Sequence, residues 1–229
     1  DLAGYYAHCT ALDDCIAGLW DTLKATKQEE DTIIVLTSDH GDLIGSHGAY
    51  KKQQPYEESI RVPMLFHYPK QFGRKGKRVK SLMNTEDIMP TLLGLSGVSI
   101  PQTVEGLDFS DHMKGGANPN DGSVLLSCPA PFGQWARRWG GKEFRGLRTN
   151  QYTYVEDLRG PWMLFDNIKD PFQLDNLLAE NKNTPIAKKF NKELKKKLKA
   201  TGDEFLPASA YISKWKYPLD KSGTVPYKN

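Results

Sequence analysis

The stretch TIIVLTSDHGD, residues 32–42, decides the fold. It begins with a continuous β-branched and apolar run and ends on polar residues and Gly41. A strand without polar alternation is typical of a central strand that is buried on both faces, as in a parallel sheet between helices. Polar residues after the carboxyl end of such a strand lie where α/β sheets place their ligands. The segment therefore predicts an α/β fold with a functional site directly after the strand.

The flanking segments favour helices on either side of this strand. Apolar residues at spacings of three and four predict a helix over 3–25 and another over about 87–95, with Thr85 or Asp87 as its cap. We expect a second strand over 61–68, a basic surface loop over 69–80 and a short strand over 79–83. Together these segments predict part of a mixed, mostly parallel sheet sandwiched by helices.

The carboxy-terminal part has a different pattern. Short strand-like segments at 123–127, 144–149, 152–156 and 162–165 are separated by turns at 150–151 and 159–161, which predicts a small antiparallel sheet. A helix over 185–200 would pack on it through Ile186, Phe190, Leu194 and Leu198. Glycine and proline concentrate near 114–122, so we assign 1–116 to an α/β catalytic domain and 117–229 to a carboxy-terminal subdomain. Residues after 202 carry no strong pattern.

Composition limits the classes of function. The 229 residues are 38% hydrophobic, which is ample for a packed core. The net charge of +3 is too small to favour nucleic acid as a partner, and no apolar run approaches the roughly 20 residues that cross a bilayer. The three cysteines (Cys9, Cys15 and Cys128) form no CxxC motif, so we expect buried or free thiols. We therefore expect neither a nucleic-acid nor a membrane partner.

Two clusters of positive charge need an interpretation. Five Lys or Arg residues lie between 70 and 78, and seven lysines lie on the outer face of the 185–200 helix. Charge runs are usually solvated faces, and we interpret the loop as a solvated connection. The helix has only a narrow apolar stripe with Phe190 as its one aromatic anchor, which argues against membrane binding.

Asp39 and His40 are the candidate metal ligands. Aspartate offers a hard oxygen and neutral imidazole a nitrogen, and Gly41 permits the backbone turn that would let both converge. An Asp-His-Gly tripeptide alone equally fits a turn that ends a strand. His47 follows seven residues after His40, and Lys52 follows thirteen residues after Asp39. A lysine near a metal site is a compact positive charge suited to an anionic oxygen.

The order of these motifs resembles the type I sulfatases of the alkaline phosphatase superfamily. In that family a strand ends in Ser-Asp-His-Gly, and then come a Gly-x-His-Gly loop, a lysine and a Tyr-Glu-x-Ser-x-Arg-Val-Pro segment; here these are residues 38–41, 45–48, Lys52 and 56–63. The resemblance continues at 5–23, 85–95, 106–110, 144–154 and 166–177. It covers nearly the whole chain but only the latter half of the family.

The resemblance implies a role for each candidate residue. Asp39 would bind a divalent cation, usually calcium, and His40 would occupy the adjacent ligand position. Lys52 would hold a sulfate oxygen, and the family spacing to Tyr56 favours it over Lys51. His47 would either order its loop or contact the substrate. The implied function is hydrolysis of an organic, possibly carbohydrate, sulfate ester by a secreted, periplasmic or lysosomal enzyme.

The family's nucleophile is missing from this sequence. It is a formylglycine made from a Cys/Ser-x-Pro/Ala-x-Arg motif, which the family carries in its amino-terminal half beside two further metal-binding aspartates. Cys128-Pro129-Ala130 lacks the arginine, and the adjacent acids Asp13 and Asp14 lie in a predicted helix. Two ligands also cannot fill the roughly 6–8 positions that calcium takes. We therefore expect a fragment or processed piece that is inactive alone and needs the amino-terminal half as a partner.

Two alternatives stay open. One is a phosphodiester or phosphonate hydrolase of the same superfamily. The other is a non-catalytic fragment that binds anionic glycans through Arg137, Arg138, Trp139 and Lys142, although these residues equally suit a surface loop.

Overall fold

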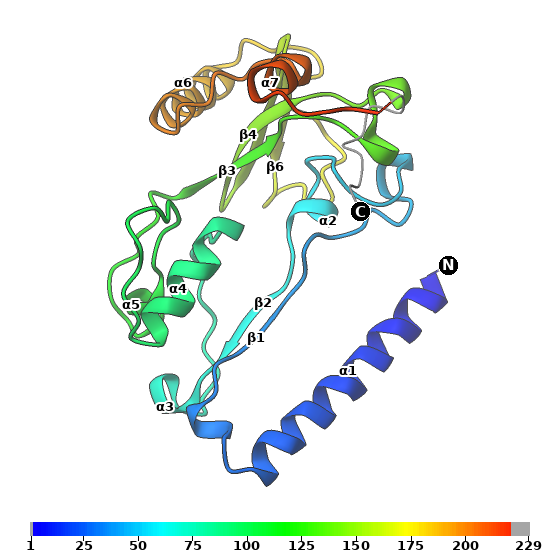
Figure 1. The fold of residues 1–229 in the computed structure, drawn as a ribbon. Helices are drawn as coiled ribbons and strands as arrows, with labels where there is room; N and C mark the ends of the chain where they lie inside the picture. Colours follow the sequence, from blue (N-terminus) through cyan, green and yellow to red (C-terminus); the bar gives the residue numbers. More distant parts are fainter. Residues whose placement is uncertain (1, 221–229) are drawn as a thin grey trace. The chain divides into compact units, whose positions relative to one another are not determined.

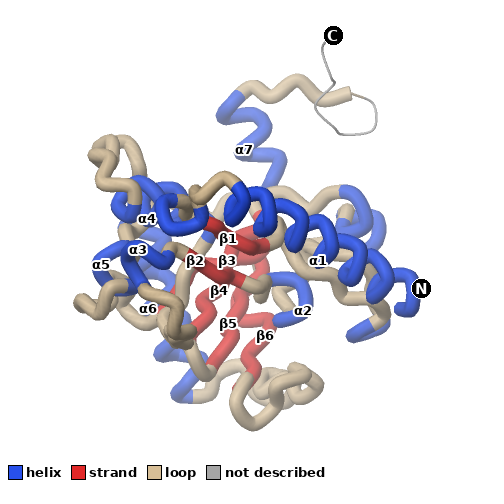
Figure 2. Tube along the Cα trace, turned by 90° about the horizontal axis from the view of Figure 1, so that it is seen from below, coloured by secondary structure: helices blue, strands red, loops and turns tan. Residues whose placement is uncertain are grey.

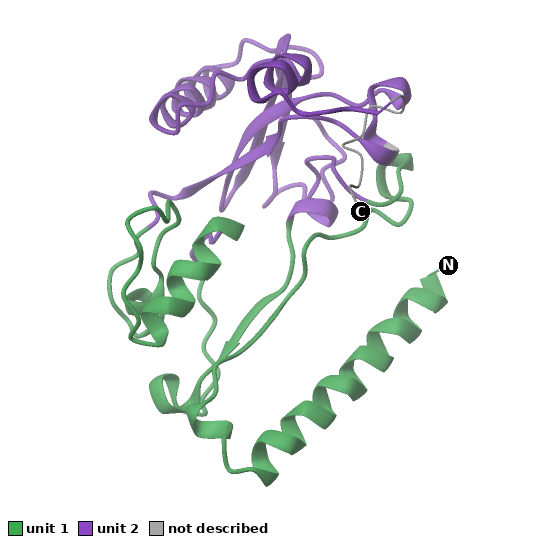
Figure 3. Cartoon of the chain, viewed as in Figure 1, with its two compact units in different colours: residues 1–51, 61–80, 85–119 green, residues 52–60, 81–84, 120–229 purple. Residues whose placement is uncertain are grey.

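The computed structural model describes residues 2–220, apart from the side chain of Gln134. These residues form two compact units (Figure 3). Unit 1 comprises residues 2–51, 61–80 and 85–119, and unit 2 comprises 52–60, 81–84 and 120–220. The proposed division at 116–117 stays a prediction, but the short segments 52–60 and 81–84 group with the carboxy-terminal unit, which the sequence did not indicate.

Unit 1 contains one long helix, a two-stranded ladder and several short helices (Figure 1). Its elements are α1 (Leu2–Ala25), η1 (Glu29–Asp31), β1 (Ile34–Thr37), η2 (Ser46–Gly48), β2 (Met64–His67), α3 (Pro69–Phe72), η3 (Thr85–Asp87), α4 (Ile88–Leu95) and α5 (Ser110–Met113).

The strands of unit 1 correct one expectation. The mixed α/β class is confirmed, but β1 and β2 pair antiparallel, with Ile34 opposite His67 and Thr37 opposite Met64. No parallel pair occurs within residues 2–220, so the mostly parallel sheet is not confirmed. None of the β1 residues is buried, contrary to the expected burial on both faces. An apolar run has the same pattern whichever way its neighbour runs, so it carries no signal for strand direction.

The helices of unit 1 follow their predicted ranges. No residue of α1 is buried, and its Trp20 ring contacts His67 of β2 at 4.4 Å between centroids. α4 is anchored by Asp87, whose carboxylate accepts a hydrogen bond from the Leu107 amide at 2.7 Å. Residues 79–83 form no strand, and the expected loop over 69–80 begins with the short helix α3.

Unit 2 is a four-stranded antiparallel sheet with the order β3-β4-β5-β6, and Figure 2 shows these strands side by side in chain order. The Asn150-Gln151 turn joins β4 to β5 as predicted, whereas the next turn falls at Leu158-Arg159, one residue early. The elements are α2 (Glu57–Ile60), β3 (Ser123–Cys128), η4 (Gly133–Trp135), η5 (Arg137–Trp139), β4 (Phe144–Thr149), β5 (Tyr152–Asp157), β6 (Gly160–Asp166), α6 (Pro185–Ala200) and α7 (Ala208–Trp215).

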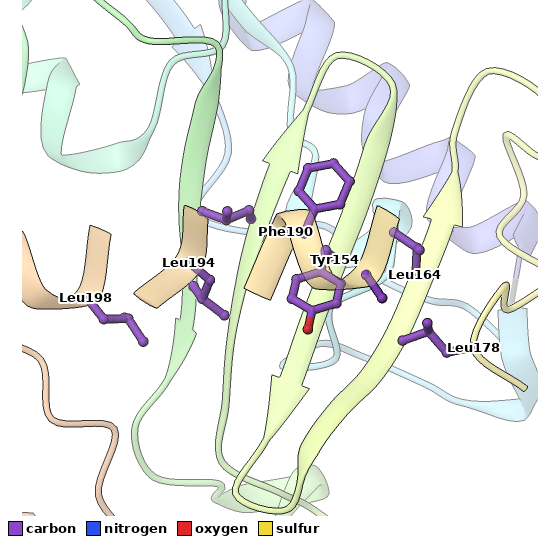
Figure 4. Packing of buried hydrophobic residues seen from close by; sticks show 8 residues of the cluster. Tyr154, Leu164, Leu178, Phe190, Leu194 and Leu198 are labelled. Carbon is purple, nitrogen blue, oxygen red and sulfur yellow. The ribbon is translucent and has the colours of Figure 1, made fainter. Parts of the chain in front are cut away.

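Both faces of this sheet carry buried apolar clusters, because side chains alternate along each strand. Leu147, Tyr154 and Leu164 pack under α6 (Figure 4), and a second cluster of Cys128, Phe144, Val155, Met163 and Phe165 covers the opposite face. α6 begins at Pro185 because Thr184 caps it, with the hydroxyl accepting from the Ala187 amide at 3.2 Å. The helix range 185–200 is confirmed.

Helix α7 was missed by sequence analysis. A buried polar cluster ties the chain before it to the sheet: Arg145, 2% exposed, is paired with Asp203, and the Tyr211 hydroxyl donates to Asp203 at 2.8 Å. Among residues 2–220, no helix is both long and apolar enough to span a bilayer.

Candidate functional site

Asp39 and His40 lie directly after β1, as predicted, and their side chains converge. His40 Nε2 lies 3.3 Å from Asp39 Oδ2, and the two side chains are 35% and 81% exposed. The turn is held locally: the Ser38 hydroxyl donates to the His40 carbonyl at 2.8 Å, and the His40 amide donates to Asp39 Oδ1 at 2.9 Å. The two candidate ligand atoms, His40 Nε2 and Asp39 Oδ2, therefore lie side by side in a turn that solvent reaches.

The His40 ring is oriented like that of a metal ligand. Its Nδ1 lies 2.8 Å from the Gly41 carbonyl oxygen, which can only accept, so Nδ1 carries the proton in the neutral ring. Nε2 then presents a lone pair beside the Asp39 carboxylate. Two acceptors at 3.3 Å are compatible when a cation or a proton lies between them. A histidine that donates its second nitrogen to a carbonyl is the usual arrangement at metal sites.

The Asp39 carboxyl is suited to stay ionised. Desolvation acts to raise its pKa, but the hydrogen bonds from the His40 amide and the Ser38 hydroxyl, together with the attraction of the His40 ring in its protonated form, outweigh it, so the pKa lies below its ordinary value. An ionised carboxylate is the form that binds a cation. Within residues 2–220, however, no three or more His, Cys, Asp or Glu side chains are grouped to hold a metal ion. Within the described residues, Asp39 and His40 therefore stay a pair of candidate ligands.

His47 lies in a closed loop that follows the Asp-His pair. Asp42 Oδ1 accepts hydrogen bonds from the amides of Ile44 at 2.9 Å and Lys51 at 3.0 Å, which clasps the two ends of the loop. Within it Ile44 and His47 adopt left-handed backbone conformations, with φ of 46° and 55°. Such non-glycine conformations need surrounding structure to hold them and concentrate at functional sites. Both roles considered for His47, ordering the loop or contacting the substrate, stay predictions.

Lys52 is the first residue of unit 2, whereas the other candidates belong to unit 1, so its convergence with Asp39 stays a prediction. Its segment is fixed to the carboxy-terminal sheet. Arg148 of β4 donates to both oxygens of Glu57, at 2.6 and 2.9 Å, and Gln173 Oε1 accepts from the Glu57 amide at 2.8 Å. We call these hydrogen bonds between Glu57 and its partners Arg148 and Gln173 the Glu57 clamp; it was not predicted from the sequence.

Cys128 and the Asp13–Asp14 pair were not assigned to the candidate site from the sequence, and the structure places them on β3 and α1. Cys128 ends β3 and is buried, and burial raises the pKa of its thiol to about 11. All three cysteines are free thiols, with Cys9 and Cys15 exposed. Asp13 and Asp14 are exposed on α1.

The second candidate for glycan binding is the loop over 137–142, whose positive charge is partly neutralised by acids. Arg137 pairs with the buried Glu143, and Lys142 Nζ lies 3.2 Å from Asp157. Trp139 is 68% exposed, with the Arg138 guanidinium 5.9 Å from its ring centroid. The structure thus leaves both interpretations of this loop open.

Comparison with known proteins identifies the family. The family described as N-sulphoglucosamine sulphohydrolase, C-terminal, matches residues 45–200. The chain belongs to the type I sulfatase family. The match lies in the carboxy-terminal portion, as the motif order predicted.

Individual relatives match between 85% and 99% of the chain. An ulvan-active sulfatase from Formosa agariphila is 40% identical over 230 residues, which cover 99% of this chain and 44% of that protein. The structure of a protein in complex with its substrate D-glucosamine-2-N,6-O-disulfate aligns with a TM-score of 0.75 and 25% identity, over 86% of this chain and 40% of the other. A phosphonate monoester hydrolase from Silicibacter pomeroyi aligns with a TM-score of 0.69 and 25% identity, over 85% and 40%. This sulfatase-family chain thus spans less than half the length of these relatives.

Proposed function

We propose that this chain forms the carboxy-terminal part of a hydrolase that removes sulfate from an organic sulfate ester, with sulfated carbohydrates as the substrate class. The observation that carries the proposal is the convergence of Asp39 Oδ2 and His40 Nε2 at 3.3 Å after β1, in a chain of the sulfatase family. Similarity to an ulvan-active sulfatase and to a protein bound to a disulfated glucosamine supports a sulfated glycan as the substrate class.

The donor set fits two positions of a divalent cation site. Asp39 supplies an ionised oxygen, and His40 supplies Nε2 with its other nitrogen turned to the Gly41 carbonyl. Calcium, expected from the family, takes roughly 6–8 ligands, so the remaining ligands would come from residues outside this chain. When bound, the cation would neutralise negative charge on the sulfate group.

The other roles belong to the loop and to Lys52. The ammonium of Lys52 would bind a sulfate oxygen and stabilise charge that develops there. The Arg148–Glu57 clamp would hold the segment that carries it, and the Asp42 clasp would hold His47 in its loop. The formylglycine nucleophile would be supplied by the amino-terminal half, so we expect residues 1–229 alone to cleave no sulfate ester.

The first test removes the proposed ligands in the protein encoded by the complete gene. Asp39→Ala and His40→Ala should each lower kcat/KM for 4-nitrophenyl sulfate more than about a hundredfold. They should also abolish the rise in melting temperature on calcium addition, since ligand at about 100 times its Kd stabilises by about 2.7 kcal/mol. Asp13→Ala, an exposed acid on α1, is the matched control and should retain both. Full activity and calcium response in Asp39→Ala would refute the assignment.

A phosphonate or phosphodiester hydrolase is the second candidate, supported by the similarity to the Silicibacter enzyme. Sulfate, phosphate and phosphonate esters of 4-nitrophenol share one leaving group. Differences in kcat/KM among them therefore report the enzyme's preference for the sulfate, phosphate or phosphonate group. Preference for the sulfate ester supports the first proposal. Preference for either phosphorus ester overturns it in favour of the second.

A further inference from the structure

Helix α6 carries an unusual concentration of positive charge. Its 16 residues include seven lysines and one acid, Glu193. The sequence alone argued only against membrane binding by this helix. The structure shows which lysines are neutralised and which are not.

The inner face of α6 is fixed against the sheet. Ala187, Phe190, Leu194 and Leu198 are buried, and the Phe190 ring stacks on Tyr154 at 5.8 Å between centroids. Figure 4 shows these apolar side chains gathered between the helix and the strands. The apolar face is therefore not available to enter a lipid surface, which removes the main contribution of an amphipathic helix to membrane binding.

Four lysines form a straight row on the outer face. Lys188, Lys192, Lys195 and Lys199 stand at i, i+4, i+7 and i+11, which places them within about 60° of one another around the helix. All four are exposed. At 1.5 Å per residue the row is about 16 Å long. We call these four residues the lysine row.

The lysine row differs in its ion pairs from two of the other three lysines of α6, Lys189 and Lys197; Lys196 is exposed and, within residues 2–220, forms no ion pair either. Lys197 Nζ lies 2.8 Å from Asp121, and Lys189 lies 3.9 Å from Glu193. No carboxylate among residues 2–220 forms an ion pair with any member of the row. In the basic loop of unit 1, residues 69–80, Lys70 pairs with Asp31 and Arg74 with Glu29 and Glu30. The loop's other cations, Lys75, Lys77, Arg78 and Lys80, are exposed like the lysine row, but they lie on non-helical chain and not along one face of a packed helix.

We propose that the lysine row is an accessory docking surface for a sulfated polysaccharide. This inference rests on the proposed function, since the occupant is the polymeric form of its substrate class. A rigid row of exposed ammonium groups complements a chain with sulfates at intervals, and binding releases the counterions held by the polyanion. Lysine ammoniums are compact charges on flexible stems, so the row needs no single register of sulfates. The effect would be retention of the polymer, without contribution to the chemistry.

The experiment compares two variants of the full-length protein, each of which loses four positive charges at a different place. The row variant carries Lys188→Gln, Lys192→Gln, Lys195→Gln and Lys199→Gln; the control carries Lys75→Gln, Lys77→Gln, Arg78→Gln and Lys80→Gln in the basic loop. Glutamine keeps good helix propensity, and thermal melting checks that both variants fold. Affinity is measured for dextran sulfate and for uncharged dextran over a salt series, together with turnover of 4-nitrophenyl sulfate.

We expect the row variant to lose at least about tenfold in affinity for dextran sulfate at low salt. The slope of log K against log salt should fall by about 3 for four charges, as counterion release predicts for a densely charged polyanion. The control should lose less than about threefold, uncharged dextran should not bind, and small-ester turnover should stay unchanged in both variants.

Several outcomes would overturn the proposal. Unchanged affinity in the row variant, or an equal loss in the control, would show that no local surface is responsible. Tighter binding to duplex DNA or to phosphatidylserine vesicles than to dextran sulfate would assign the row to another class of partner. The two proposals fail separately: absent turnover of sulfate esters refutes the proposed function, and row-independent binding refutes the docking surface.

Discussion

The two units differ in how they use their apolar side chains. Unit 2 buries clusters on both faces of its sheet, whereas in unit 1 the helix α1 buries none of its residues and β1 has Leu36 at 39% exposure. The unit that holds the clamp around Glu57 is thus built around its own core, while Asp39 and His40 follow a two-stranded ladder. The candidate ligands and the Lys52 segment therefore depend on different sources of rigidity.

Substitution of a core residue of unit 2 should change the free energy of unfolding most. Phe190→Ala removes the ring that stacks on Tyr154, and it should lower the free energy of unfolding by about 3–5 kcal/mol. Leu19→Ala on α1, where the side chain is 69% exposed, should change it by less than about 0.5 kcal/mol. Urea denaturation followed by circular dichroism measures both. Similar losses at the two positions would remove the contrast between the units.

A smaller change is expected from the ion pairs, of which unit 2 has a largely buried one and unit 1 an exposed one. Arg148 and Glu57 have side chains only 13% and 11% exposed, so Glu57→Gln should cost about 3 kcal/mol by leaving the guanidinium poorly compensated. Arg74→Gln in unit 1, where Arg74 is 61% exposed, should cost less than about 1 kcal/mol. A double-mutant cycle of Glu57→Gln with Arg148→Gln isolates the coupling. Additive losses in that cycle would show that the pair does not act as a clamp.

The smallest effect concerns acid stability of unit 2. Burial alone would raise the pKa of Asp203, but hydrogen bonds from Arg145, the Phe205 amide and Tyr211 lower it below the ordinary value. A lowered folded-state pKa gives stability that is present above the unfolded pKa and is lost as the pH falls through the folded pKa. Asp203→Asn should cost about 2 kcal/mol at neutral pH. It should also flatten the loss of stability below about pH 4.

Unfolding free energies measured from pH 7 down to pH 2 check this prediction. Arg145 keeps its contact with the Phe144 carbonyl in the variant, so the sheet should still form. An acid profile identical to that of the natural sequence would show that Asp203 titrates alike in both states.

The sequence predicted those helices whose caps and apolar spacing lie within the helix itself or next to it. α6 was placed correctly because Thr184 caps it, Pro185 suits its first turn and the apolar period is regular. α7 was missed because its N-cap position is Pro207, which offers no side-chain acceptor. The direction of β1 relative to β2 was not predictable, since an apolar run fits either pairing.

The same division holds at the candidate site. Asp39 and His40 are adjacent in sequence, so their turn and its glycine predicted that they converge. The clamp on the Lys52 segment joins residues 91 and 116 positions apart, and neither Arg148 nor Gln173 carries a local signal for its partner. Glu57 stands in the family's Tyr-Glu-x-Ser-x-Arg-Val-Pro motif, but only the structure shows that Arg148 and Gln173 are its partners.

The sheet order of unit 2 has a consequence for how the chain acquires its structure. Each strand pairs with its neighbour in sequence, so the ladders form between nearby segments. Proteins dominated by such local contacts fold faster than those whose pairings are distant. We therefore expect the β4–β5–β6 meander to form early. Glu57, made long before Arg148 during synthesis, would be captured only once that sheet exists.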